Sequence, residues 1–381
     1  MIKKFDDIIA CRFLFFIISF YIGFWTIRIP TIKDQLSTDY MGISYTFITF
    51  AIGSIITMLF ASNIIKKLSS KKTVMYAGVT QGFLWLVIPF ITELYFFMFF
   101  AFIFGCCYGI YEVAINLQAS QIEKREGRSM MSGFHAFFSL GILAGSFITS
   151  FFLEWQISFF INILIYVIVM LPLSFIFANF LDNDETVSEN NKSNIFFMWP
   201  LILFFLAILS MTAALTEGGV DAWAALYMRD IIGAKGFTIG IATISFNLFM
   251  VIGRLIGDNL RDRLGVHSFL IILISLCIAG LLIIFIYSSI VSSIIGFGVL
   301  GLGASSIVPL AYSIAGKIKG VDSAVGITII SISVYGIFMI APGLMGFIAQ
   351  SFGVNYVFSP IIILFVIILI PIIIFKKKFN V

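Results

Sequence analysis

The chain has 381 residues, of which 61% are hydrophobic and only 11% are charged. A soluble domain carries about 25% charged residues, so the composition excludes a soluble globular protein. The net charge of +4 reflects basic residues that set the orientation of loops on either side of a membrane. It therefore gives no sign of nucleic-acid binding, and we expect no nucleic-acid partner. All four cysteines fall in apolar stretches without metal-ligand spacing, so we expect neither a metal nor a cofactor.

Long apolar runs such as "SPIIILFVIILIPIIIF" lack the alternation of a membrane β-barrel. Since backbone groups in lipid must be satisfied within each helix, the fold class is an all-α polytopic membrane protein. At about 20 residues a span, the apolar segments predict twelve transmembrane helices. They lie at residues 8–31, 41–62, 73–92, 95–118, 130–153, 156–180, 197–225, 237–258, 267–288, 290–314, 323–348 and 354–375.

One polar segment, "DNDETVSENNKSN" at 182–194, divides the spans into six and six. We expect an N-terminal six-helix bundle at 1–181, a cytoplasmic linker at 182–194 and a C-terminal six-helix bundle at 195–381. An offset of 198 residues maps Trp25 to Trp223 and Gly105 to Gly303. This repeat predicts two pseudo-symmetric bundles with a site between them near mid-membrane.

Most of the 23 basic residues fall in loops on one side of this layout. Cytoplasmic loops carry the excess of lysine and arginine, so both termini are expected in the cytoplasm. We expect a monomer in the lipid bilayer of a bacterial cytoplasmic (inner) membrane.

Three motifs point to a family. The segment "GRLIGDNLRDRLG", 253–265, resembles the cytoplasmic signature of the major facilitator superfamily, whereas "ASNIIKKLSSKK" in the first half lacks the acidic residue and the glycines. "YEVAINLQASQIEKREGRSMMSGFHAFFSLGILAG", 111–145, and "EGGVDAWAALYMRD", 217–230, resemble the MosC-like subgroup of bacterial facilitators. The resemblance implies a secondary transporter of a small molecule and leaves the substrate open.

On the first span, Tyr21, Trp25 and Arg28 share one helix face. An arginine inside a span is costly and normally faces the bundle interior with a partner. Glu217 and Asp221 lie on the seventh span, its symmetry mate, so we expect Arg28 to meet one of them across a central cavity. A static ion pair or a charge cluster at the outer mouth is the alternative. Trp223 follows in the same segment as a further substrate-binding candidate.

On the fourth span, Tyr108, Glu112 and Asn116 form another stripe at i, i+4 and i+8. A carboxylate without a partner in a low dielectric is stable mainly when protonated, which suits a proton carrier. The alternative is a hydrogen-bonded structural glutamate. His135, on the fifth span, either titrates itself or makes a polar contact behind Glu112. The proton-coupling candidates are therefore Glu112, Asp221, Glu217 and His135.

Two groups on the eighth span complete the candidates. Asn247 lies midway along it, where lining a cavity and bonding helices together are equally plausible roles. At its inner end we expect a gate or, alternatively, a charge cluster that only sets topology. The gate residues are Arg254, Asp258, Asp262 and Arg263.

The composition and motifs favour a secondary active transporter that moves a small polar metabolite by alternating access, coupled to protons. A sugar, a polyol or an amino-sugar-like compound fits one arginine among several carboxylates. The alternative within this class is an exporter of metabolites, siderophores or drugs by proton antiport. A membrane enzyme is disfavoured, because only His135 and His267 are present and no metal motif occurs.

Overall fold

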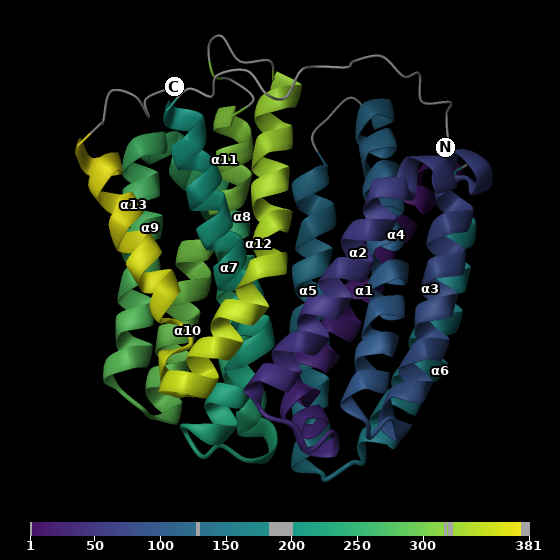
Figure 1. Ribbon diagram of the computed structural model, residues 1–381. Coiled ribbons are helices and arrows are strands. Elements are labelled where there is room, and N and C mark those ends of the chain that lie inside the picture. Colours follow the sequence, from purple (N-terminus) through teal and green to yellow (C-terminus); the bar gives the residue numbers. More distant parts are fainter. Residues whose placement is uncertain (1, 127–129, 183–200, 316–317, 319–322, 375–381) are drawn as a thin grey trace. The chain divides into compact units, whose positions relative to one another are not determined.

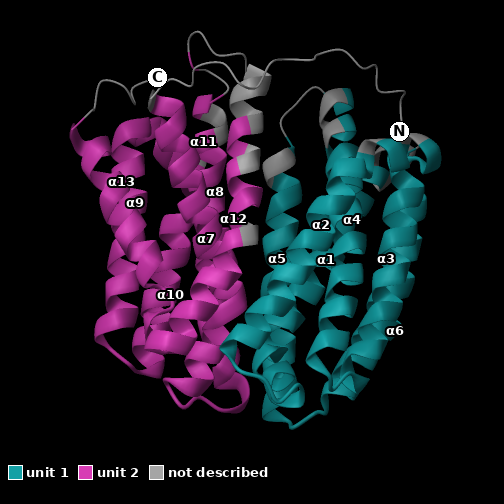
Figure 2. Ribbon diagram, viewed as in Figure 1, with its two compact units in different colours: residues 1–189 teal, residues 190–381 magenta. Residues whose placement is uncertain are grey.

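The computed structural model describes residues 2–126, 130–182, 201–315, 318 and 323–374, and every regular element among them is helical (Figure 1). Twelve of its helical stretches are long and apolar enough to cross a membrane. The predicted all-α polytopic fold with twelve spans is confirmed. The chain divides into two compact units, residues 1–189 and 190–381 (Figure 2). Apart from Asp182, the expected linker lies outside the described residues.

The first unit contains six long helices and one short 3₁₀ turn: α1 (Ile2–Gln35), α2 (Tyr40–Leu68), α3 (Ser70–Val87), η1 (Ile88–Phe90), α4 (Leu94–Glu126), α5 (Met131–Glu154) and α6 (Phe159–Phe180). Side chains cap three of these helices, α2, α3 and α6. Asp39 Oδ1 accepts from the Gly42 amide at 2.8 Å, and Ser158 Oγ accepts from the Ile161 amide at 3.3 Å. Such caps satisfy amides that have no partner within the helix.

The second unit contains α7 (Leu201–Asp230), η2 (Gly236–Gly240), α8 (Ile241–Leu264), α9 (Val266–Ile286), α10 (Ile290–Ala304), α11 (Ile307–Ala315), α12 (Ser323–Phe352), η3 (Val354–Tyr356) and α13 (Ser359–Ile374). The tenth span was expected as one helix, and the structure builds it from α10 and α11. The break falls at Ser305 and Ser306, where Ser305 Oγ donates to the Leu302 carbonyl at 2.8 Å. Serine side chains that bond nearby backbone compete with regular helix.

The two units repeat the same packing. In the first, α1 packs against α5, α2 against α4, and α3 against α6; in the second, α7 packs against α12, α8 against α10, and α9 against α13. Glycines permit the closest approaches. A Cβ on Gly105 would collide with the Phe50 carbonyl, and one on Gly301 would collide with the Phe246 carbonyl. Gly301 follows Gly105 by 196 residues, and Phe246 follows Phe50 by the same number. The repeat seen in the structure is therefore two residues shorter than the offset of 198 between the sequence anchors.

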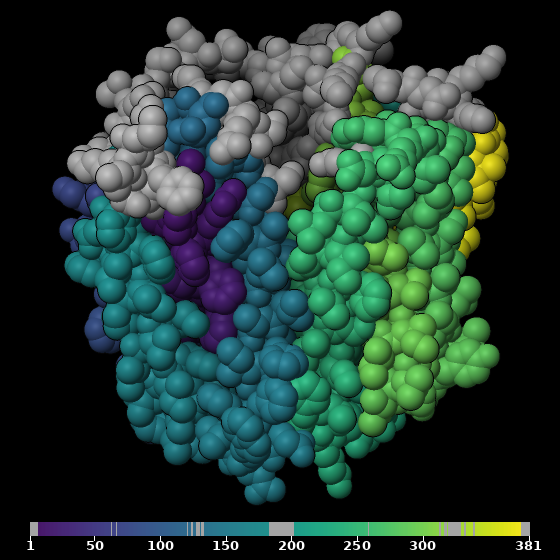
Figure 3. Space-filling model, turned by 180° about the vertical axis from the view of Figure 1, so that it is seen from behind, coloured from purple at the N-terminus to yellow at the C-terminus, as the bar shows by residue number. Residues whose placement is uncertain are grey.

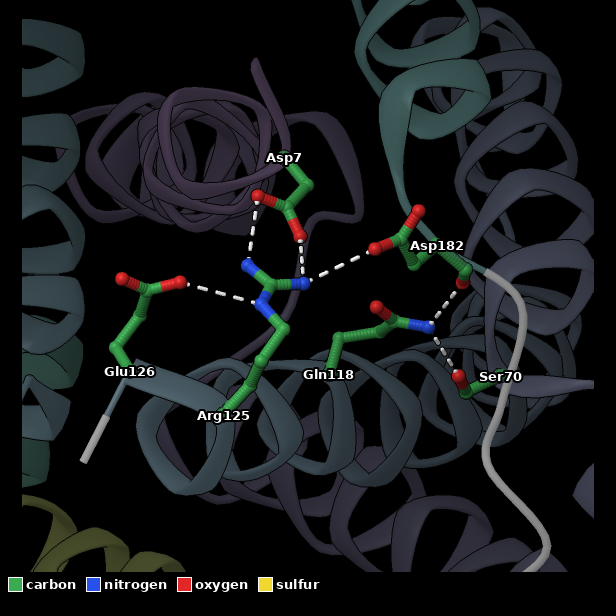
Figure 4. Close-up of polar contacts among 6 residues, drawn as sticks. All are labelled: Asp7, Ser70, Gln118, Arg125, Glu126 and Asp182. Atoms are coloured by element: carbon green, nitrogen blue, oxygen red, sulfur yellow. Dashed lines mark hydrogen bonds and ion pairs between the residues drawn. The ribbon is translucent and has the colours of Figure 1, made fainter. Parts of the chain in front are cut away.

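Helix α4 runs further than the sequence indicated and carries Arg125, which was expected in a loop, on its last turn. Arg125 Nη1 lies 2.6 Å from Asp7 Oδ2 on α1 and 3.0 Å from Asp182 Oδ2 beyond α6, and its Nε lies 3.2 Å from Glu126 Oε1 (Figure 4). Gln118 Nε2 donates to the Asp182 carbonyl at 3.0 Å. These contacts tie α1, α4 and the end of α6 together at one end of the first unit.

Candidate functional site

An aromatic cluster holds the first-span candidates Tyr21 and Trp25. Tyr21 stacks on Trp85 of α3 with ring centroids 5.6 Å apart, and Trp25 lies 6.0 Å from the same ring. Trp85 in turn meets Phe104 of α4 edge-on at 4.6 Å. Sequence reasoning missed Trp85. Its position four residues after Gln81 in an otherwise apolar span was the available signal.

Beside this cluster lies a small cavity within the first unit. Its volume is ≈ 10 Å³, measured as the space open to the centre of a water molecule, and Tyr21, Gln81 and Ser174 are among its lining residues. Among the described residues, the Tyr21 hydroxyl and both amide atoms of the buried Gln81 have no hydrogen-bond partner. A cavity of this size with several polar partners fits one water molecule.

Arg28 is 3% exposed and makes its described contacts within the first unit. Its Nε donates to Asn162 Oδ1 on α6 at 3.0 Å, and its Nη2 donates to the Ile157 carbonyl at 2.9 Å. The guanidinium also lies 5.9 Å from the centre of the Phe159 ring. Sequence reasoning missed Asn162, an amide in the first turn of α6. Pairing of Arg28 with the second unit stays a prediction.

The stripe on α4 is held together by its own side chains. Asn116 Nδ2 donates to Glu112 Oε1 at 3.0 Å and to the Glu112 backbone carbonyl at 2.9 Å. Glu112 is 7% exposed, and its Oε2 has no hydrogen-bond partner among the described residues. Tyr108 packs against Phe50 with ring centroids 5.4 Å apart. One carboxylate oxygen is thus bound and the other is open to a proton.

His135 lies among aromatic rings on α5. Its ring is 5.3 Å from that of Phe15 and 6.4 Å from that of Phe138. Glu112 makes its described side-chain bond along its own helix, so the contact expected between His135 and Glu112 stays a prediction.

In the second unit, α7 and α8 bring an acidic and a basic side chain together. Both carboxylate oxygens of Glu217 lie 3.4 Å from Arg254 Nη2. Arg254 Nε also donates to the Ser305 carbonyl at 3.4 Å, where the tenth span breaks. Asp221 follows one turn beyond Glu217 on α7. Arg254, assigned to an inner gate from the sequence, is therefore also the charge partner of a candidate proton carrier.

The remaining second-unit candidates are dispersed. Trp223 is fully buried, and Asn247 Nδ2 bonds the Thr243 carbonyl of its own helix at 3.1 Å. Asp262 pairs with its neighbour Arg261 at 3.1 Å, and Arg263 is exposed. The side chain of Asp258 lies outside the described residues. In the part of the chain that the structure describes, no group of three or more His, Cys, Asp or Glu could hold a metal ion.

Comparison with known proteins gives the family. The Major Facilitator Superfamily model matches twice in tandem, at residues 9–216 and 201–379. An MFS-type transporter of Yersinia pestis is 28% identical, over 93% of this chain and 92% of its own length. The membrane protein MosC of Rhizobium meliloti is 26% identical, over 91% of this chain and 85% of its own length.

Solved structures agree on the fold. The nucleoside transporter NupG superposes with a TM-score of 0.73 at 12% identity, covering 99% of this chain and 100% of that one. A bacterial homologue of the human lysosomal transporter Spinster, captured inward-facing and unoccupied, gives 0.74 at 9% identity, covering 99% and 98%. Two tandem matches across the chain and two full-length relatives show that this multi-pass membrane protein belongs to the Major Facilitator Superfamily.

Proposed function

We propose that this chain is a proton-coupled secondary transporter of a small polar metabolite, with Glu112 as its proton carrier. The observation that carries the proposal is the burial of Glu112 in a span, with one oxygen bound by Asn116 and the other unpartnered among the described residues. A charged carboxylate in a low dielectric is costly unless it is paired. Glu112 can therefore take up a proton on one side and release it once its surroundings change.

Asn116 makes Glu112 sensitive to substrate. Its amide stabilises one carboxylate oxygen, and a substrate hydroxyl that competes for this amide would shift the balance between the charged and protonated forms. Alternating access then needs only that the two conformations differ in affinity for the proton and the substrate.

The aromatic cluster supports a polyol, a sugar or an amino sugar. The partly exposed ring of Trp25 has a flat apolar face and a polar edge, which suit a molecule that has both hydroxyl groups and an apolar ring face. Glu217 and Asp221 on α7 would favour an amine on that ring. The structural neighbour NupG, named as a nucleoside transporter, supports a small polar substrate of this kind. We place the protein in the bacterial inner membrane with both termini in the cytoplasm.

The test is Glu112→Gln, which mimics the protonated form, in proteoliposomes with labelled myo-inositol, glucose and glucosamine as probes. For the compound that the wild type accumulates under an inward proton gradient, we expect the variant to keep exchange and lose accumulation. Glu93→Gln is the matched control, because this exposed glutamate lies in the turn before α4. Accumulation by Glu112→Gln at the wild-type level would refute the role of Glu112 and move it to Asp221.

A further inference from the structure

The first half of α1 has one exposed stripe. Between Asp7 and Tyr21 every side chain is buried except those of Ile9, Arg12, Phe13 and Phe16. The spacing i, i+3, i+4 and i+7 places all four on one face of the helix. Figure 3 shows the N-terminal part of α1, in purple, reaching the surface between α6, in teal, and α5, in blue.

The walls of this crevice are aromatic. Phe13 is 39% exposed and stacks on Phe177 of α6 with ring centroids 4.8 Å apart. It also meets Phe137 of α5 edge-on at 6.0 Å. The outer face of α6 continues the apolar surface, since Phe175 and Ile176 are each 48% exposed. Such a flank in a membrane protein lies against acyl chains.

Within the described part of the chain, Arg12 is a cation without a counter-ion in this crevice. Its guanidinium lies 5.6 Å from the centre of the Phe137 ring, and its Nε is buried with no hydrogen-bond partner among the described residues. The carboxylate nearest along the helix, Asp7, is held by Arg125 at 2.6 Å. An intramembrane arginine is costly and is normally paired, so the described residues leave this cation open to a negative group.

The geometry leaves room for that group near the membrane boundary. Arg12 follows the start of the candidate span at Asp7 by five residues, which is about 7.5 Å along a helix. A long arginine side chain spans this distance while its charged end reaches the headgroup level. Opposite it on α5 stands Gly133, where an added Cβ would lie 3.8 Å from Arg12 Nη2, so this position adds no side chain to the space.

We propose that this crevice binds an anionic phospholipid from the leaflet at the N-terminal end of α1. Arg12 binds the phosphodiester, and an acyl chain lies along Phe13, Phe16 and Phe177. A lipid is the occupant, rather than a soluble anion, because the stripe opens onto an apolar flank. This proposal stands independently of the transported substrate and of proton coupling.

The test uses the full-length protein, purified and delipidated in a neutral detergent. Phosphatidylglycerol, phosphatidylcholine or inorganic phosphate is titrated while the thermal unfolding midpoint is followed. We expect the wild type to respond to phosphatidylglycerol at lower concentrations than to phosphatidylcholine, and not to phosphate. Arg12→Gln should need about fivefold more phosphatidylglycerol, the effect of one basic residue at an anionic surface. Arg12→Lys should respond like the wild type.

Arg229→Gln is the matched control, since Arg229 pairs with its neighbour Asp230 at the far end of α7. It should respond to phosphatidylglycerol as the wild type does. An unchanged response of Arg12→Gln would overturn the proposal, and so would an equal response of the wild type to inorganic phosphate. Should Arg12→Gln fail to fold, native mass spectrometry of the wild type decides. Preferential retention of phosphatidylglycerol supports the site, and equal retention of both lipids refutes it.

Discussion

The contact between Asp7 and Arg125 gives a sharp prediction, because its two partners differ in burial. The Asp7 side chain is fully buried, whereas that of Arg125 is 22% exposed and also contacts Asp182 and Glu126. Removing Arg125 leaves a buried carboxylate without its cation. Removing the Asp7 charge leaves a guanidinium with two other acidic neighbours and access to water. Arg125→Gln should therefore destabilise the first unit more than Asp7→Asn does.

The magnitudes follow from this asymmetry. Leaving one member of a buried pair uncompensated costs about 3–5 kcal/mol, and we take about 3 because water reaches Arg125. Asp7→Asn should cost about 1 kcal/mol, the value of one hydrogen bond. At roughly 2–4 °C for each kcal/mol in a domain of this size, Arg125→Gln lowers the unfolding midpoint by roughly 6–12 °C and Asp7→Asn by roughly 2–4 °C.

The assay is thermal unfolding of the purified protein, followed with a thiol-reactive dye or by intrinsic fluorescence. The double variant should lose less stability than the two single variants added together, since they share one interaction. The hydrogen bond to Asp7 raises the pKa of the Arg125 guanidinium above its ordinary value. A raised pKa gives stability that is fully present below the unfolded value and is lost only as the pH rises through the folded value. The deficit of Arg125→Gln should therefore be constant from about pH 6 to 9.

Equal midpoints for Arg125→Gln and Asp7→Asn would refute the argument from burial. If the loss of stability in Arg125→Gln disappeared between about pH 6 and 9, the assignment of Arg125 as a partner that stays charged would be refuted. Glu126→Gln serves as the control, because this partly exposed neighbour contacts only Nε of Arg125, and its substitution should shift the midpoint by less than either variant.

Three further predictions concern helix packing and the charged sites. Gly105→Ala should destabilise the first unit by about 1–3 kcal/mol through overpacking and so lower the unfolding midpoint. Gly336→Ala should leave the midpoint unchanged, because no atom of the described residues lies within 4 Å of the added Cβ. Glu217→Gln and Arg254→Gln should each reduce the rate of transport in proteoliposomes. The double variant should have a higher unfolding midpoint than Arg254→Gln alone, because Arg254→Gln leaves the Glu217 carboxylate without its partner. Asn162→Leu should lower the unfolding midpoint, because it removes the acceptor of a buried guanidinium; Asn179→Leu, at an exposed position on the same helix, should not.

Much of the fold could be predicted because the membrane imposes it. Apolar runs of span length predict helices, and the polar segment between the sixth and seventh spans predicts the division into six and six. The break between α10 and α11 was not predictable from hydropathy, because Ser305 and Ser306 interrupt the helix without ending the apolar stretch. Nor could hydropathy show that α4 continues to Arg125, since a charged helix beyond the membrane resembles a loop.

The candidate site was only partly within reach of the sequence. Periodicity placed Glu112 and Asn116 on one face, and the bond between them follows directly from that spacing. Partners from other helices depend on packing, which periodicity along one helix does not encode. That is why Trp85 beside Tyr21 and Asn162 beside Arg28 were missed, and why the pairing of Glu217 with Arg254 was not foreseen.

The central claim, coupling of solute movement to protons, is tested most directly by recording both fluxes in the same proteoliposomes. Labelled myo-inositol, glucose or glucosamine is added outside while a trapped dye reports the lumenal pH, with no proton gradient imposed. We predict that the transported compound acidifies or alkalinises the lumen in a fixed ratio to its uptake, and that Glu112→Gln takes up the compound without a pH change. Uptake by the wild type with no proton movement would contradict the account.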